Sequence, residues 1–188
     1  CKALMRQKGM ESVDELQSYM IQRAEDFLKT KGRKLIGWDE ILEGGLAPGA
    51  TVMSWRGESG GIKSARMGHD VIMTPGNFLY FDFYQADPKT QPYAIGGYTP
   101  VKTVYSYNPV PVDSLDAEQQ QHIIGVQANT WTEYINDEKH LEYMMFPRAL
   151  AVAELAWTPQ ELRSWADFKP RMNANIPVLQ RMGINAFT

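Results

Sequence analysis

Four short apolar runs of strand length, separated by helical patterns, most constrain what this chain can fold into. They lie at residues 34–38, 51–55, 70–74 and 122–128. Strands that alternate with helices are typical of parallel βα units. A full (β/α)₈ barrel needs eight strands and about 250 residues. Four units in 188 residues therefore predict an α/β fold that is either half of a barrel or a small doubly wound sheet.

Local signals set the bounds of the predicted helices. Ser12 followed by Glu15 is the capping-box pattern, and Gly32 provides a C-terminal stop for that helix. Pro147 either kinks the strongest helical pattern or starts its main part. The predicted helices after the first lie at residues 61–67 (ending at Gly68), at 142–157, after a cap at Ser164, and at 176–182 (ending at Gly183).

The segment of residues 77–121, rich in Tyr, Pro and Gly, separates the third and fourth predicted strands. It is far longer than the usual connection of about 4–6 residues, and loops of such length are uncommon unless they are functional or disordered. Its aromatic content argues against disorder. We therefore expect an ordered segment with a role in function.

Composition excludes several classes of protein. A net charge of −3 without a long Lys/Arg block argues against nucleic-acid binding. No stretch approaches the roughly 18 uncharged apolar residues of a membrane span. The lone cysteine, Cys1, and three scattered histidines show no metal-ligand spacing, so we expect no metal site. The glycine-rich residues 56–61 lack the spacing of a phosphate-binding loop.

Aromatic and carboxylate side chains follow all four predicted strands. In chain order they are Trp38, Trp55, Tyr80 with Asp82, and Trp131 with Glu133. Parallel α/β folds place function at the carboxyl ends of their strands. Indole faces pack against the apolar faces of sugar rings, and carboxylates accept hydrogen bonds from sugar hydroxyls. A single tryptophan at a strand end is more simply explained as core, but the whole series favours a sugar-binding site.

Asp39 and Glu40 form a tempting pair of catalytic acids. Retaining glycosidases need two carboxyl groups about 5–5.5 Å apart. Adjacent strand residues point to opposite faces, so the pair could work only if the backbone bends there. We favour the alternative that both residues lie at a helix N-terminus, where acidic side chains complement the helix dipole.

Five blocks of sequence resemble glycoside hydrolase family 20, the β-N-acetylhexosaminidases. In order they read KLIGWDEIL, TVMSWRG, NFLYFDFYQ, GVQANTWTEYI and EYMMFPRALAVAELAWT, and RMGINAF resembles the end of the family's catalytic domain. The resemblance implies the C-terminal half, about strands 5–8, of a (β/α)₈ TIM-type barrel. Residues 1–188 would then be one partial catalytic domain from a longer chain.

One departure from the family pattern bears on catalysis. The family's Asp-Glu pair lies in an H-x-G-G-D-E type motif at the end of the fourth strand, and no such motif occurs here. The substrate-binding arginine near the first strand is also missing. Asp39 and Glu40 follow one strand too late to be the pair. The chain as given is therefore expected to be inactive by itself.

The resemblance also implies roles for the aromatic residues. Trp38, Trp55 and Trp131 match the indoles that wall the pocket for the N-acetyl group, and Trp131 also stacks on the sugar ring. Tyr80 matches the tyrosine whose hydroxyl holds the acetamido carbonyl oxygen. In this family the acetamido oxygen itself attacks the anomeric carbon, giving an oxazolinium intermediate, while a glutamate protonates the leaving oxygen.

Asp82 and Glu133 match the carboxylates that bind the sugar hydroxyls at positions 4 and 6. The implied substrates are glycans ending in β-linked N-acetylglucosamine or N-acetylgalactosamine, and the chemistry requires no metal or organic cofactor. Neither nucleic acid nor membrane is expected as a partner. Family members act on external glycans, so we expect an exported protein, at the periplasm, the cell surface or outside the cell.

Two other interpretations remain open. The first is a non-catalytic carbohydrate-binding protein that kept the pocket and lost the acid. The second is a small α/β domain in which every tryptophan is core. As an enzyme fragment or as a binding protein, half a barrel has a sheet with two open edges, and open edges invite pairing with another chain. We therefore expect the isolated chain to self-associate or to cover these edges with residues 77–121.

Overall fold

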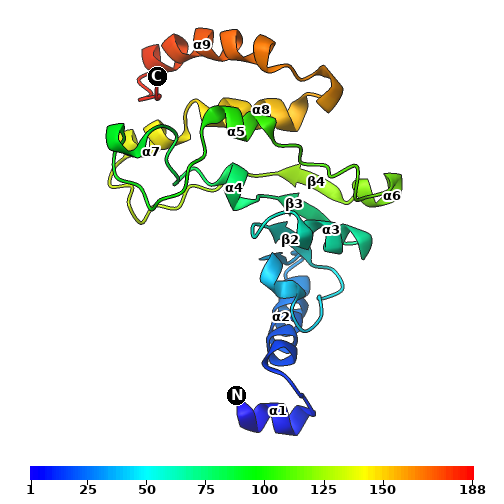
Figure 1. Cartoon of the computed structure of the whole chain (residues 1–188). Helices are drawn as coiled ribbons and strands as arrows, with labels where there is room; N and C mark the ends of the chain where they lie inside the picture. The colour runs from blue at the N-terminus through cyan, green and yellow to red at the C-terminus, as the bar shows by residue number, and fades with distance from the viewer. The chain divides into compact units, whose positions relative to one another are not determined.

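A computed structural model describes all 188 residues of the chain (Figure 1). Its internal contacts divide the chain into two compact units. Unit 1 comprises Cys1–Met73 and Val110–Ile124, and unit 2 comprises Thr74–Pro109 and Gly125–Thr188. The assignment of residues 1–188 to one partial barrel domain stays a prediction.

All four predicted strands are present, each shorter than its apolar run. They are β1 (Ile36–Trp38), β2 (Thr51–Ser54), β3 (Val71–Met73) and β4 (Ile123–Val126). They form one sheet in the order β1-β2-β3-β4, with β4 beginning in unit 1 and ending in unit 2. The β1–β2 and β2–β3 pairs are parallel, as predicted. Sequential order and parallel direction are the arrangement of strands in a βα barrel.

The helices of unit 1 include the two that local signals predicted, one after Ser12 and one near residues 61–67. They are α1 (Lys2–Lys8), α2 (Val13–Thr30), the 3₁₀ helix η1 (Asp39–Leu42), α3 (Ser59–Arg66) and α6 (Ala117–Gln120). The Ser12 hydroxyl caps α2 by accepting a hydrogen bond from the backbone N–H of Glu15 at 3.1 Å. The Glu15 carboxylate accepts from Glu11 rather than from Ser12, so the predicted capping box is only half formed. Gly32 adopts a φ of 65° just after the helix, which confirms the predicted stop.

The core of unit 1 lies where α2 packs against the start of the sheet. Its buried residues are Leu35, Ile41, Ala47, Ala50 and Val52, with Ile21, Leu28, Leu42 and Leu46 packed against them. Ile21 and Leu28 lie seven residues apart on α2, and so on the same face of that helix. This packing fixes the turn that carries η1, which follows β1 directly.

The C-terminal helices of unit 2 correct two predictions. They are α7 (Glu138–Met145), α8 (Arg148–Trp157), the 3₁₀ helix η3 (Gln160–Leu162) and α9 (Trp165–Arg181). The single helix predicted for residues 142–157 is two helices, and Pro147 starts the second, one of the two expected effects. The separate helix predicted at 176–182 is the end of α9, which Ser164 caps and which continues through Pro170 and Pro177. No helix of the chain has both the length and the apolar character needed to cross a membrane.

Residues 77–121 are ordered, as their aromatic content predicted. In unit 2 they hold most of α4 (Gly76–Leu79), the 3₁₀ helix η2 (Pro88–Thr90) and α5 (Val101–Ser106). Tyr105 on α5 is buried and stacks on Phe168 of α9, with ring centroids 4.6 Å apart. The long connection is therefore anchored by its own rings.

Candidate active site

The carboxyl edge of the unit 1 sheet carries two of the predicted indoles. Strand β1 ends at Trp38, and Trp55 directly follows β2. Because the two strands are parallel and Trp38 pairs with Met53, both tryptophans lie at the same edge. Both side chains are half-buried. The structure thus brings Trp38 and Trp55 to one edge, as the strand-end pattern predicted.

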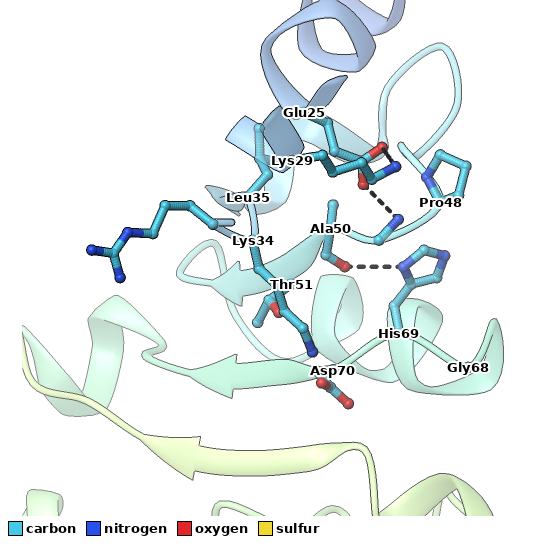
Figure 2. Close-up of a pocket in the computed structure, with 12 residues that line it drawn as sticks. Glu25, Lys29, Lys34, Leu35, Pro48, Ala50, Thr51, Gly68, His69 and Asp70 are labelled. Carbon is cyan, nitrogen blue, oxygen red and sulfur yellow. Dashed lines mark hydrogen bonds and ion pairs between the residues drawn. The ribbon is translucent and has the colours of Figure 1, made fainter. Parts of the chain in front are cut away.

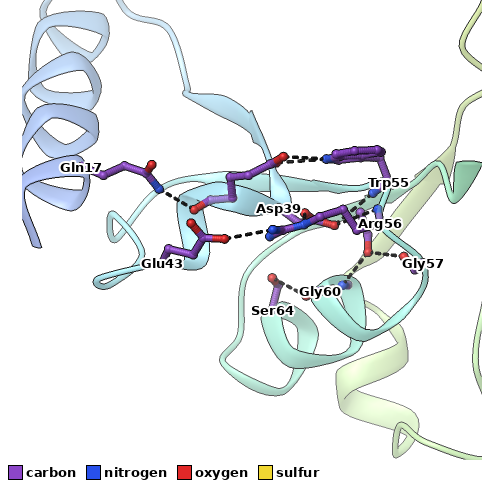
Figure 3. Close-up of polar contacts among 11 residues, drawn as sticks. Gln17, Asp39, Glu43, Trp55, Arg56, Gly57, Gly60 and Ser64 are labelled. Carbon is purple, nitrogen blue, oxygen red and sulfur yellow. Dashed lines mark hydrogen bonds and ion pairs between the residues drawn. The ribbon is translucent and has the colours of Figure 1, made fainter. Parts of the chain in front are cut away.

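Asp39 and Glu40 begin the 3₁₀ helix η1, which confirms the interpretation of this pair as acidic residues in a first helical turn. Both side chains also contact the residues after β2, and Figure 3 shows Asp39 beside Trp55 and Arg56. Asp39 is 2% exposed and accepts hydrogen bonds from the backbone N–H groups of Trp55, at 3.1 Å, and Arg56, at 3.2 Å. Its other oxygen accepts from Arg56 Nε at 2.5 Å. Asp39 is therefore a buried structural carboxylate.

Tyr80 and Trp131 lie side by side in unit 2. A parallel bridge joins Tyr80 to Asn129, with hydrogen bonds from Phe81 N to Asn129 O (2.7 Å) and from Asn129 N to Leu79 O (2.8 Å). The rings of Tyr80 and Trp131 are 6.5 Å apart between centroids and tilted by 59°. Tyr80 is 9% exposed, while Trp131 is 41% exposed. This is the geometry of an anchored phenol beside an indole that a ligand can reach.

Asp82 is a buried carboxylate, and one of its oxygens lacks a hydrogen-bond partner. It is 5% exposed, and its Oδ1 has no hydrogen-bond partner. Burial raises the pKa of Asp82, and the negative charge of Glu133 adds to the increase, against hydrogen bonds from the backbone N–H groups of Asp82 and Trp131. Glu133 itself is exposed. An unsatisfied buried carboxylate oxygen calls for an explanation, and a ligand hydroxyl is the natural donor for it.

Arg148 is the functional candidate that the strand-end pattern missed. It is fully buried at the start of α8. Its guanidinium donates hydrogen bonds to the carbonyl oxygens of Phe81, Phe83, Thr99 and Met144. Burial lowers the pKa of Arg148 to about 9, although the charge of Asp82 opposes this. The available signal was an arginine at the head of a helical run that is apolar apart from Glu154.

A separate cavity of about 290 Å³ lies at the amino edge of the unit 1 sheet, opposite Trp38 and Trp55 (Figure 2). Glu25 of α2 accepts hydrogen bonds there from Lys29 (2.8 Å) and from Gly49 N (2.6 Å). Burial would raise the pKa of Glu25, but these two donors outweigh it and the pKa is lowered. The amino-terminal face of a barrel is associated with stability rather than catalysis. Glu25, the buried carboxylate of this cavity, is thus bonded to groups of the cavity itself.

Metal ligands are not assembled in either unit. No group of three or more His, Cys, Asp or Glu side chains is placed to hold a metal ion. The only ion pair that involves a histidine joins His122 Nδ1 to Asp70 Oδ1 at 3.4 Å.

Residues 1–160 match the catalytic domain of glycosyl hydrolase family 20. The chain therefore belongs to this family. It is 53% identical over 98% of its length to a beta-hexosaminidase of Porphyromonas gingivalis, and 34% identical over 81% to one of Vibrio furnissii. It spans only about a quarter of the length of these two relatives, 24% and 25%.

Solved structures give the same result. The whole chain superposes on the exo-β-N-acetylglucosaminidase of Vibrio harveyi in complex with N-acetylglucosamine, with a TM-score of 0.89, 32% identity and 30% of that chain covered. A mutant beta-hexosaminidase of Streptomyces plicatus, in complex with its product, superposes with a TM-score of 0.79 and 27% identity. The match covers 90% of this chain and 35% of that chain. These matches and the parallel sheet confirm the predicted fold as part of a (β/α)₈ barrel. By family the protein is a glycoside hydrolase.

Proposed function

We propose that the complete protein carrying this chain removes terminal β-linked N-acetylglucosamine or N-acetylgalactosamine from glycans. The family and the names of the relatives support this reaction class. The observation that carries the proposal is the buried carboxylate of Asp82, whose Oδ1 has no hydrogen-bond partner, next to the Tyr80–Trp131 pair. A carboxylate acceptor beside an accessible indole suits a sugar ring, which has hydroxyls at its edge and C–H groups on its faces.

Each candidate residue has one proposed role. Trp38 and Trp55 contact the N-acetyl group, and Trp131 contacts both this group and the sugar ring. Tyr80 donates its hydroxyl hydrogen to the acetamido carbonyl oxygen. Asp82 and Glu133 accept hydrogen bonds from the sugar hydroxyls at positions 4 and 6.

The proposed reaction is assisted by the substrate. The acetamido oxygen forms a bond to the anomeric carbon while the bond from that carbon to the leaving oxygen breaks. An acid group donates a proton to the leaving oxygen, and water later opens the oxazolinium ring. Apolar indole walls keep water from competing with the acetamido oxygen and hold it near the attacking geometry, an effect that can reach several kcal/mol.

Hydrolysis of three chromogenic substrates by the complete protein tests the proposal. We expect turnover of the β-N-acetylglucosaminide or the β-N-acetylgalactosaminide, and none of the β-glucoside, which lacks the acetamido nucleophile. Comparable turnover of the glucoside would contradict the proposed mechanism. The exported location that we propose is tested by fractionating the cells that make the protein.

A non-catalytic carbohydrate-binding protein is the second candidate. In this candidate the pocket binds the sugar and no acid completes it; within these 188 residues, Asp39 is held by Trp55 and Arg56 and Glu40 by Trp55, so neither supplies one. This candidate predicts that the complete protein binds N-acetylglucosamine, as measured by calorimetry, and turns over none of the three substrates.

A further inference from the structure

The geometry points to Glu40 as a positioning residue that fixes the indole of Trp55. This role rests on the proposed function of Trp55 as a contact for the N-acetyl group. Both residues lie in unit 1, Glu40 in η1 and Trp55 immediately after β2. The Glu40 carboxylate faces the indole N–H of Trp55.

The indole N–H of Trp55 is shared between both carboxylate oxygens of Glu40. The distances from Nε1 to Oε1 and Oε2 are each 3.0 Å. Hydrogen bonds to an ionised acceptor are roughly twice as strong as bonds between neutral groups. At the other end of the residue, the backbone N–H of Trp55 donates to Asp39. Two consecutive carboxylates therefore hold the backbone and the ring of one tryptophan, which leaves its side-chain torsions little freedom.

The support behind this pair is itself fixed. Gln17 of α2 donates its side-chain amide hydrogen to the backbone carbonyl of Glu40 at 2.7 Å. Asp39 packs so tightly that a Cβ added at Gly60 of α3 would lie 2.8 Å from the Asp39 Cβ. Helices on either side of η1 thus hold the acidic pair in place. The position of Trp55 is therefore fixed by α2 and α3, which hold Glu40 and Asp39 in place.

A mobile indole at this position has a specific consequence. A wall that contacts the N-acetyl group excludes larger acyl groups and water only while it stays in place. Loss of the Glu40 acceptor removes the hydrogen bonds that the indole N–H makes to this carboxylate and lets the ring turn. The ratio of kcat/KM for the N-acetyl substrate to that for a substrate with a larger acyl group then falls. A general loss of folding would lower both values alike and leave this ratio unchanged.

Steady-state kinetics of Glu40→Met and Glu40→Gln in the complete protein test this role with two substrates. They are a β-N-acetylglucosaminide and its N-propionyl analogue, which differ by one methylene, a difference that apolar pockets distinguish by about 10–200-fold. For Glu40→Met we expect kcat/KM on the N-acetyl substrate to fall roughly tenfold, or about 1.4 kcal/mol, with a smaller fall on the N-propionyl substrate. Glu40→Gln keeps an oxygen acceptor and is expected to recover most of the discrimination.

Glu43→Gln is the matched control, because Glu43 is an exposed neighbour that bonds Arg56 and not the indole. It is expected to retain the wild-type discrimination. The Trp55→Phe variant provides the second control, since it lacks the indole N–H. In this variant, adding Glu40→Met should lower kcat/KM on the N-acetyl substrate little further. Equal losses on both substrates, or an undiminished effect of Glu40→Met in Trp55→Phe, would overturn the inference.

A spectroscopic measurement separates this inference from the proposed function. If the wild-type protein turns over no aminosugar substrate, the proposed function fails, and indole ¹⁵N–¹H spectra of the complete protein still test the contact. The Trp55 resonance is assigned by its loss in Trp55→Phe. We expect its proton shift to move upfield in Glu40→Met and to stay in place in Glu43→Gln. An unmoved resonance in Glu40→Met would show that Glu40 does not hold the ring.

Discussion

Arg148 holds the two backbone carbonyls that flank Asp82. Its guanidinium donates to the oxygens of Phe81 and Phe83, and it lies 4.6 Å from the centroid of the Phe81 ring. The positive charge of Arg148 also favours the ionised form of Asp82, although burial has the larger and opposite effect. The orientation of the proposed sugar-binding carboxylate is therefore set by a buried cation that a ligand does not need to contact.

Replacing Arg148 with Met is expected to destabilise the complete protein. The change leaves buried carbonyl groups without donors, each at a cost of about 1–3 kcal/mol. We expect the free energy of unfolding, measured with urea, to fall by at least about 3 kcal/mol. The control is Lys102→Met, because Lys102 is an exposed cation on α5. That loss should stay within about 1 kcal/mol, and a similar small loss for Arg148→Met would contradict the account.

Asp82→Asn is expected to raise stability at neutral pH while it weakens sugar binding. Burial raises the pKa of Asp82 in the folded protein, so the folded state binds a proton more readily than the unfolded state. The free energy of unfolding contributed by this group therefore falls as pH rises from the ordinary pKa of an aspartate through the raised one. The stability gain of Asp82→Asn should be largest at pH 7 and should shrink below about pH 4. Urea titrations at both pH values measure it, and a gain that is independent of pH would be inconsistent with an ionised buried Asp82.

Tyr80→Phe removes one hydroxyl and keeps the ring that packs beside Trp131. If the hydroxyl holds the attacking acetamido oxygen, kcat and kcat/KM should fall together by roughly 10²–10³-fold. Tyr143→Phe is the matched control, since it also loses a hydroxyl, one that donates to Gln91 at 2.8 Å. We expect its rate to stay within about threefold of wild type. A similarly small effect for Tyr80→Phe would remove Tyr80 from the mechanism.

A polypeptide of these 188 residues alone is expected to self-associate through the edges of its sheet. Strands β1 and β4 are the outer strands, and they expose Ile36 (55%) and Ile124 (56%). Lysine on an edge strand opposes pairing with another chain. Light scattering should show oligomers of the unmodified polypeptide and a shift toward monomer in Ile36→Lys with Ile124→Lys. A monomeric unmodified polypeptide would contradict this expectation.

The strands and several helix ends were predictable because their signals are local. Apolar runs marked the strands, and Ser12, Gly32 and Gly183 marked helix ends through caps and left-handed backbone. The division of α9 into two predicted helices was wrong, because the helix continues through Pro170 and Pro177, although an interior proline costs about 3 kcal/mol in isolation. Burial of Phe168 and Met172 on the same helix offsets that cost. Such tertiary packing is invisible in a local pattern.

The candidate site was predictable only in part for the same reason. The strand-end rule found Tyr80 and Trp131 as neighbours because it depends on sheet topology alone. It could not assign Glu40 to the indole of Trp55, fifteen residues away, since that contact depends on how η1 is held. Nor could it predict the hydrogen bonds from Arg148 to the carbonyl oxygens of Phe83 and Phe81, which lie 65 and 67 residues away in the sequence.

The most direct test of the account is a series of aminosugar substrates whose acetamido group carries zero to three fluorine atoms. Fluorine withdraws electrons from the carbonyl oxygen, so an acetamido nucleophile becomes weaker with each atom. For the complete protein we predict that kcat/KM falls more than about 100-fold across the series, or roughly 2.7 kcal/mol of barrier. A kcat/KM that is the same for all four substrates would show that the acetamido group is not the nucleophile and would contradict the account.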